Sequence, residues 1–250
     1  MSTQLFGKNA FLAGLSGDDF SLLRNHLSQK ELRAGITLHR YGETVDDVFF
    51  PHSGVVTMTL PLQEGRGVGV AFVGFDGIVG GFAAAAMMPA SCDSEVLIAG
   101  QAARLSASDF RDALGRSATL RQWTAQFDNA LIAQAQRLAL CNAAHSVEAR
   151  ICRCLLEVQD RVGGDRVSFT QDALARLLGV RRTTITLVAG RLEMAGALNC
   201  RRGFMQIVDR AVIERHCCEC YAHARDYAAR RHADQSEVVS PRTVVALRSN

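Results

Sequence analysis

The sequence lacks the features of a secreted or membrane-spanning protein. Its first residues contain no basic stretch followed by an apolar core, so we expect no signal peptide. The most apolar stretch, residues 67–88, is interrupted by Asp76 and by glycines, which favours buried strands over a membrane span. The eight cysteines are therefore expected to be reduced thiols of a cytoplasmic protein that has no membrane partner.

The sequence also lacks the motifs of common enzyme classes. It contains no phosphate-binding GKS or GKT loop and no recognisable nucleophile–base pair. A metal enzyme built on a small β-domain would need two closely spaced histidines and a carboxylate on neighbouring strands, whereas His39 and His52 are thirteen residues apart. We therefore do not expect an enzyme, and a cupin-like metal enzyme is kept only as a remote alternative.

Charge is distributed unevenly along the 250 residues, whose formal net charge is only +3. Residues 1–110 contain seven basic and eleven acidic side chains, a balance of −4. Residues 150–231 contain fifteen arginines and nine acidic side chains, a balance of +6. A basic C-terminal half indicates a polyanionic partner, although two differently solvated surfaces would give the same asymmetry.

The hydrophobic pattern changes twice along the chain. Short alternating runs broken by glycines, over residues 32–105, predict a β-sandwich or jelly roll. Residues 108–142 contain no proline, and apolar side chains recur there at 4-3-4-3 spacing, which predicts a long helix. Short helices and a hairpin are predicted over residues 147–208, so the fold class is α+β.

The seven-residue repeat of the long helix favours a homodimer. A stripe of this kind suits a helix that pairs with its copy, and polar members of the stripe can set the register. The same stripe also suits a helix that packs on its own domain, and of the two we favour the dimer. The residues predicted to form the dimer contact are Leu120, Thr124, Phe127, Leu131 and Leu138.

The segment from Thr170 to Val188 has the spacing of a helix-turn-helix. Thr170 is predicted to cap the first helix, and Gly179 is predicted to end it in a left-handed conformation. The second helix would turn Arg182 and the neighbouring threonines to solvent, where arginine can pair with guanine and threonine can contact phosphate or a thymine methyl group. A solvated amphipathic hairpin is the alternative explanation for this segment alone.

A basic hairpin follows the helix-turn-helix directly. Residues 198–208 predict two strands joined by an Arg-Arg-Gly tip, which is the form of a wing that lies against the phosphate backbone. The two features together predict double-stranded DNA as the partner. The residues predicted to contact DNA are Thr170, Gln171, Arg181, Arg182, Thr183, Thr184, Thr186, Arg201 and Arg202.

These segments resemble the Crp–Fnr family of transcription regulators, most closely over residues 147–208. Shorter N-terminal resemblances are Phe11–Ser16, Leu32–Leu38, Tyr41-Gly42-Glu43 and Val48–Gly54. The resemblance implies a cyclic-nucleotide-binding-like sensor β-roll at 1–115, a dimerisation helix at 116–143, a winged helix-turn-helix at 144–235 and a polar tail at 236–250. It also implies a homodimer on an inverted-repeat operator, a small-molecule effector as a candidate signal, and RNA polymerase as a partner if the protein activates transcription.

The sequence departs from the family at the positions that define its known sensors. Ile78 and Ala90-Ser91 stand where relatives that bind cyclic AMP carry a glutamate and an arginine–serine pair, so we expect cyclic AMP to bind weakly or not at all. The N-terminal cysteines of iron–sulfur relatives are missing. Thr183 and Leu187 also differ from the family's base-reading residues, so the resemblance does not fix the operator. The candidate ligand pocket comprises Ile78, Val79, Gly80, Phe82 and Ser91.

A crowded group of cysteines, Cys217, Cys218 and Cys220, follows His216. Zinc sites usually use two separated ligand pairs, and helical spacing would place Cys217 near Cys220 while turning Cys218 away. We therefore predict free thiols, with no metal site and no cofactor. A thiol- or metal-based redox switch acting through these three cysteines is the alternative function.

Overall fold

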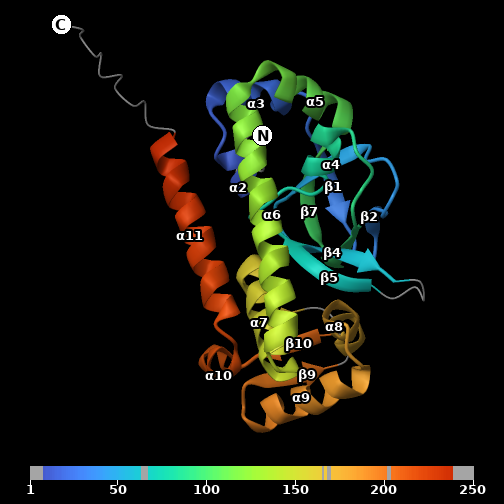
Figure 1. The fold of residues 1–250 in the computed structure, drawn as a ribbon, viewed down its shortest axis with the longest axis vertical. Coiled ribbons are helices and arrows are strands. Elements are labelled where there is room, and N and C mark those ends of the chain that lie inside the picture. Colours follow the sequence, from blue (N-terminus) through green and yellow to red (C-terminus); the bar gives the residue numbers. More distant parts are fainter. Residues whose placement is uncertain (1–7, 63–66, 165, 168–169, 202–203, 239–250) are drawn as a thin grey trace, which may run out of the picture.

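The computed structural model describes residues 8–62, 67–164, 166–167, 170–201 and 204–238. An N-terminal domain of two sheets and short helices lies beside one long helix, α6 (Ala118–Ala144), and a smaller C-terminal domain lies at the far end of that helix (Figure 1). The mixed helix and strand content confirms the predicted fold class.

Two antiparallel sheets form the N-terminal domain. Their strand orders are β1-β7-β3 and β2-β6-β4-β5. The register of β3 on β7 pairs Val48 with Leu105 and Phe50 with Ala103, which places apolar side chains on the inner face. The strands are β1 (Ser28–Leu32), β2 (Thr37–His39), β3 (Asp47–Pro51), β4 (Val55–Pro61), β5 (Gly67–Val73), β6 (Asp93–Ile98) and β7 (Gly100–Ser106).

Short helices close this domain at the end where α6 begins. They are α2 (Ala10–Ala13), α3 (Gly17–Arg24), α4 (Gly81–Ala86) and α5 (Ala107–Arg116). The side chain of Ser117 caps α6 by accepting from the backbone of Leu120, and it also donates to the buried carboxylate of Asp19. This interaction fixes the start of α6 against α3, because Asp19 belongs to α3.

One face of α6 completes the core of the N-terminal domain. The Phe127 ring lies 5.1 Å from that of Phe11 and 5.6 Å from that of Trp123, whose indole donates to the Phe11 carbonyl at 3.0 Å. Further along the helix, the Gln134 amide accepts from the backbone of Phe72 at 2.6 Å and donates back to it at 3.2 Å. This pair of bonds fastens α6 to the strand β5.

This packing changes the interpretation of the seven-residue repeat. Leu120 and Phe127, two of the residues predicted to meet a second copy, belong to the core of their own domain, which is the alternative packing that the repeat also allows. Of these residues, Leu120, Thr124, Phe127 and Leu138 are buried within the chain, and Leu131 is half-buried against a neighbouring core cluster. Leu120, Thr124, Phe127 and Leu138 therefore have little surface left for contact with a second copy.

The C-terminal domain packs directly on β4 and β5. Its helices are α7 (Val147–Val162), α8 (Gln171–Leu178), α9 (Arg182–Met194), α10 (Arg210–His216) and α11 (Cys220–Val238). Its sheet, in the order β8-β10-β9, comprises β8 (Arg166–Val167), β9 (Leu198–Arg201) and β10 (Phe204–Ile207). The side chains of Val55 and Phe72 share one apolar cluster with Leu174 of α8, so the core is continuous between the two domains.

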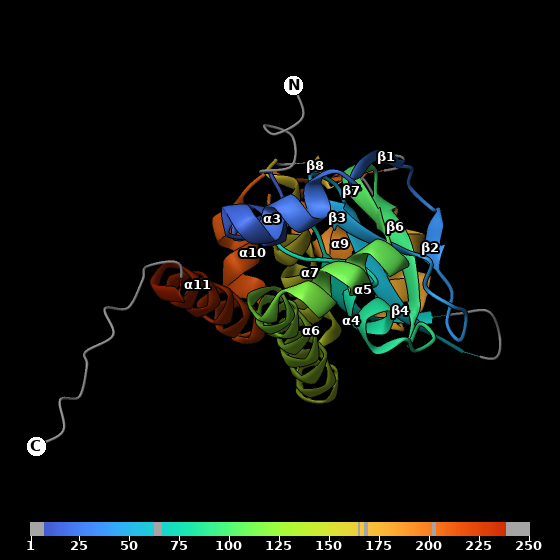
Figure 2. The ribbon, with the colours of Figure 1, turned by 90° about the horizontal axis from the view of Figure 1, so that it is seen from above.

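The contact between α8 and β5 is too close for most side chains. A Cβ atom at Gly69 would lie 3.2 Å from the Leu177 carbonyl oxygen, so glycine allows the approach. Nearby, the Arg161 guanidinium is 2.9 Å from the Asp76 carboxylate, which joins α7 to the loop after β5. Seen from above, α11 runs beside α6, and another side of α6 is left uncovered by the part of the chain that the structure describes (Figure 2). Among the described residues, no helix is both long and apolar enough to cross a membrane.

Candidate nucleic-acid interface and sensor cavity

The helix-turn-helix forms at the predicted residues. Thr170 caps α8 by accepting from the Ala173 backbone at 3.1 Å, and Gly179 ends the helix with a φ of +63°. The Val180 N–H then donates to the Ala175 carbonyl at 3.0 Å, which closes the turn before α9 begins. Ile185 and Val188 anchor α9 in the core, so the opposite side of α9 must face outward.

The outward side of α9 has the chemistry of a base-reading surface. Arg181, Arg182 and Thr183 are exposed, and the first turn contains no acidic residue that would repel a phosphate. Thr186 is also exposed and donates to the Gln171 amide oxygen at 2.8 Å, so these two predicted DNA contacts support one another. Thr184 is half-buried and lies at the margin of this side.

A further residue of this surface was noted in the sequence only as a departure from the family. Leu187 lies one turn after Thr183 and keeps 58 % of its surface exposed, although it is apolar. An exposed leucine on a recognition helix can contact the methyl group of thymine.

The wing is present beside α9. Phe204 pairs with Arg201 across the antiparallel strands β9 and β10, and Arg201 is exposed at the end of β9. Arg202, the second arginine predicted on the wing, lies outside the described residues. No ion pair with another described residue is formed by Arg181, Arg182 or Arg201. Their positive charges are therefore available to a polyanion.

An apolar cavity of about 350 Å³ lies between α6 and the sheet. Of the predicted pocket residues, Phe82 and Ser91 line it, whereas Ile78 and Val79 are buried in core clusters and Gly80 caps α4. No basic side chain lines this cavity among the described residues. The full lining is Met58, Leu60, Val70, Ala71, Phe82, Ser91, Cys92, Asp128, Leu131, Ile132 and Ala135.

Asp128 is the acidic group of this cavity. It extends from α6, and burial raises the pKa of its carboxyl group to about 6. A carboxylate in an apolar cavity repels a phosphate, so the chemistry of the cavity is opposite to that required for a cyclic nucleotide.

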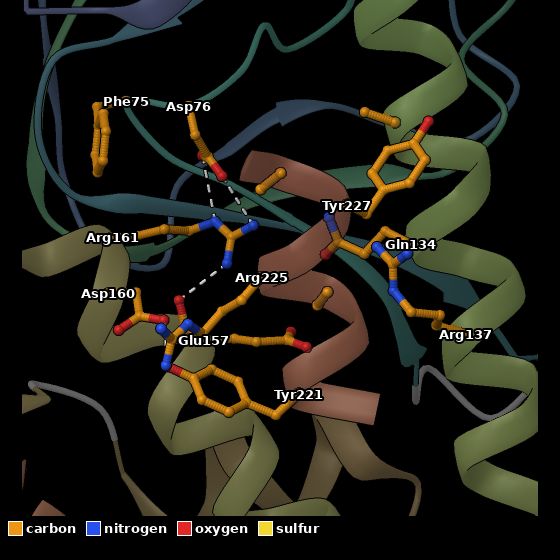
Figure 3. Close-up of a pocket in the computed structure, with 13 residues that line it drawn as sticks. Phe75, Asp76, Gln134, Arg137, Glu157, Asp160, Arg161, Tyr221, Arg225 and Tyr227 are labelled. Carbon is orange, nitrogen blue, oxygen red and sulfur yellow. Dashed lines mark hydrogen bonds and ion pairs between the residues drawn. The ribbon is translucent and has the colours of Figure 1, made fainter. Parts of the chain in front are cut away.

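A second cavity, of about 220 Å³, lies where α6, α7 and α11 meet (Figure 3). Its charged side chains are engaged with one another. Arg161 pairs with Asp76, the Tyr221 hydroxyl donates to Asp160 at 2.7 Å, and Arg137 lies over the Tyr227 ring at 5.3 Å. We assign no ligand to this cavity, because its charges already have partners.

The cysteines are arranged differently from the sequence prediction. Cys218 and Cys220 lie together, joined by Cys141 and His145 from the end of α6, and the ligand atoms of all four are within 4.8 Å of one another. Cys217 is half-buried against a different apolar cluster. The prediction that Cys217 approaches Cys220 while Cys218 turns away was therefore wrong.

The environment of Cys141 is electropositive. Burial alone would raise the pKa of its thiol, but the Arg153 guanidinium and hydrogen bonds with His145 and Cys218 outweigh that effect and hold the pKa below its ordinary value. By contrast, burial raises the pKa of the Cys152 and Cys154 thiols in the core of α7 to about 12. Those two cysteines are therefore structural.

Comparison with known structures shows the same fold. A putative transcriptional regulator of the Crp/Fnr family from Eubacterium rectale has 17% identity and a TM-score of 0.67, over 84% of this chain and 98% of that chain. FixK2 from Bradyrhizobium japonicum has 16% identity and a TM-score of 0.64, over 77% and 98%. A CRP/FNR-family regulator from Thermus thermophilus has 21% identity and a TM-score of 0.63, over 78% and 98%.

The two halves of the chain match two family models. Residues 29–117 match the cyclic nucleotide-binding domain, and residues 149–215 match the Crp-like helix-turn-helix domain. No functionally curated protein has significant sequence similarity to the chain. The two matched segments together cover more than half of the chain. The chain therefore belongs to the Crp–Fnr family of transcription regulators, which are DNA-binding proteins and not enzymes.

Proposed function

We propose that the protein is a sequence-specific regulator that binds an inverted-repeat operator as a homodimer. The observation that carries this proposal is the outward side of α9, which presents Arg182, Thr183 and Thr186 to solvent while Ile185 and Val188 hold the helix in the core. A helix held in this way can enter the major groove without disturbing its own domain. If the protein activates transcription, RNA polymerase is a further partner.

The positions of the arginines assign them different roles. Arg182 is the first residue of α9, a position from which a side chain can reach the edges of the DNA bases. The positive end of the helix dipole also attracts the phosphate backbone of the DNA there. Arg201 lies on the wing, where contacts with phosphate position the domain but do not discriminate between sequences.

The first prediction separates these roles. Arg182→Ala should cost about 1–3 kcal/mol on the best operator and relax the choice of one base pair in each half-site. Arg201→Ala should weaken binding to all duplexes about equally and reduce the slope of affinity against salt concentration by roughly one unit. Fluorescence titrations on selected and random duplexes at several salt concentrations measure both effects.

Arg24→Ala is the matched control, because it removes an exposed arginine from α3 in the other domain and should leave binding unchanged. If Arg182→Ala kept both the affinity and the base preference of the wild type, α9 would not be the recognition helix.

The uncovered side of α6 is the surface that we propose for the dimer. Ala125, Ile132 and Ala139 recur every seven residues and are exposed, and Gln136 and Ala143 continue the same side. A strip of small and apolar residues with this spacing suits close pairing with a second copy of the helix. Leu140, also exposed, borders the strip.

The second prediction tests this strip. Ile132→Glu combined with Leu140→Glu should convert a dimer into monomers at micromolar concentration, because a charge would be buried without a partner at the contact. Ile36→Glu is the control, since Ile36 is 52% exposed and Ile132 is 53% exposed, and Ile36 belongs to another surface. Sedimentation velocity measures the outcome. A wild-type monomer, or a double variant that remains dimeric, would contradict the proposed contact.

We also propose that the signal is a small, apolar compound that carries no negative charge. Its site is the cavity beside α6, whose lining combines aliphatic residues with Phe82 and the single acid Asp128. Because Ile132 belongs both to this lining and to the proposed dimer strip, occupancy of the cavity would affect how two copies of α6 meet.

The third prediction concerns the charge in this cavity. The folded-state pKa of Asp128, about 6, is above the ordinary value of 3.8, so the folded protein holds this proton more tightly than the unfolded chain. The charged form of Asp128 therefore lowers the stability of the folded protein, an effect that is absent below about pH 4 and complete above about pH 6. Asp128→Asn should raise the free energy of unfolding at about pH 7.5 by roughly 1–2 kcal/mol after solvent screening, and by less at about pH 4.5.

Urea unfolding at the two pH values measures this difference. Asp112→Asn, which neutralises an exposed carboxylate of α5, should change the stability little at either pH. An equal gain at both pH values, or a loss of stability at pH 7.5, would show that the charge of Asp128 does not oppose folding.

A further inference from the structure

Four side chains at the joint between the two domains form a compact set of nitrogen and sulfur atoms. Cys141 lies in the last turn of α6, and His145 is the residue at which α6 ends. Cys218 lies between α10 and α11, and Cys220 is the first residue of α11. We propose that these four residues bind one zinc ion.

The distances agree with a single tetrahedral ion. With Zn–S bonds of about 2.3 Å and a Zn–N bond of about 2.0 Å, tetrahedral geometry places two sulfur ligands about 3.8 Å apart and a sulfur and a nitrogen about 3.5 Å apart. The Cys141 and Cys218 sulfurs are 3.6 Å apart, and the Cys220 sulfur is 3.6 Å from His145 Nδ1. All four ligand atoms lie within 4.8 Å of one another.

The surroundings of the four ligands also fit a metal site. Nε2 of His145 donates to the Glu219 carboxylate at 3.1 Å, which leaves Nδ1 with its lone pair directed toward Cys220. A carboxylate behind a ligating histidine is the usual support of a zinc site. Three thiolates and one zinc ion carry a net charge of −1, and the buried Arg153, which pairs with Glu157 at 2.9 Å, also interacts electrostatically with Cys141.

The composition of the set favours zinc over other metals. Three thiolates and one imidazole form a complete tetrahedral shell of soft ligands, which is typical of structural zinc and leaves no open position for a substrate. An iron–sulfur cluster places several atoms between its ligands, and most clusters use four cysteines. The close approach of the four ligand atoms therefore fits one ion better than a cluster.

The position of the site indicates its role. It would join the end of α6 to the start of α11, immediately before Ser146 caps α7, the first helix of the C-terminal domain. Away from this site, α11 is attached to α6 through Tyr227, whose hydroxyl accepts from Asn129 at 2.8 Å and whose ring lies beside Arg137. Zinc would add a rigid link at the point where the chain turns between its domains.

The experiment uses the full-length protein purified under reducing conditions without added chelator. Elemental analysis should find one zinc ion per chain. Cobalt(II) added to the metal-free protein should give the intense visible absorption of a tetrahedral thiolate site, together with a sulfur-to-cobalt charge-transfer band. Cys141→Ser, Cys218→Ser, Cys220→Ser and His145→Ala should each lower the zinc content or change the cobalt spectrum.

Cys217→Ser is the matched control, because this cysteine stands next to Cys218 in the chain but outside the set, and it should keep one zinc ion. Glu219→Gln should still bind zinc, with an affinity about 10–100-fold lower in competition with a chromogenic chelator. The cobalt spectrum of this milder variant keeps the proposal testable even if a ligand variant fails to fold.

Several results would overturn the proposal. One is wild-type protein with less than stoichiometric zinc and no tetrahedral cobalt spectrum. Another is equal loss of zinc from Cys217→Ser and Cys218→Ser, which would place the ion elsewhere. Iron and sulfide in place of zinc, or a Cys141–Cys218 disulfide in the reduced preparation, would also contradict it.

Discussion

The structure depends on the packing of one face of α6 against the N-terminal domain. Phe127, Trp123 and Phe11 form an aromatic cluster there, and Gln134 adds two hydrogen bonds to the backbone of β5. This contact decides which side of the helix remains uncovered, and therefore where a second copy can bind. The C-terminal domain is held by contacts of its own, because α8 packs on β5 and α7 packs on β4.

The DNA-binding elements could be predicted from the sequence because their signals are local. Thr170, Gly179 and the apolar anchors of α9 act within about twenty residues, and each has a conformational reason that is visible in the sequence. The side of α6 that forms contacts could not be predicted in the same way. A seven-residue repeat shows that one side of a helix is buried, but it does not show whether a second copy or its own domain covers that side. The apolar cavity beside α6 was only partly predicted, because Ile78 and Val79 are buried in core clusters.

The Cys–His group was missed because its two halves are more than seventy residues apart in the chain. Cys141 and His145 form one pair at helical spacing, and Cys218 and Cys220 form another, which together are the two separated ligand pairs that zinc sites use. In the sequence, only Cys217, Cys218 and Cys220 stand out as a group, because they are crowded together. The pattern becomes apparent only when the end of α6 and the start of α11 are known to meet.

The uncovered side of α6 is linked to the shape of the operator. If the uncovered side of α6 pairs two copies, then two α9 helices are related by a two-fold axis. Selection of bound duplexes from a random pool by the purified protein tests this most directly. We expect enrichment of an inverted repeat with half-sites about one helical turn apart. Enrichment of a direct repeat or a single half-site, or no enrichment at all, would contradict it.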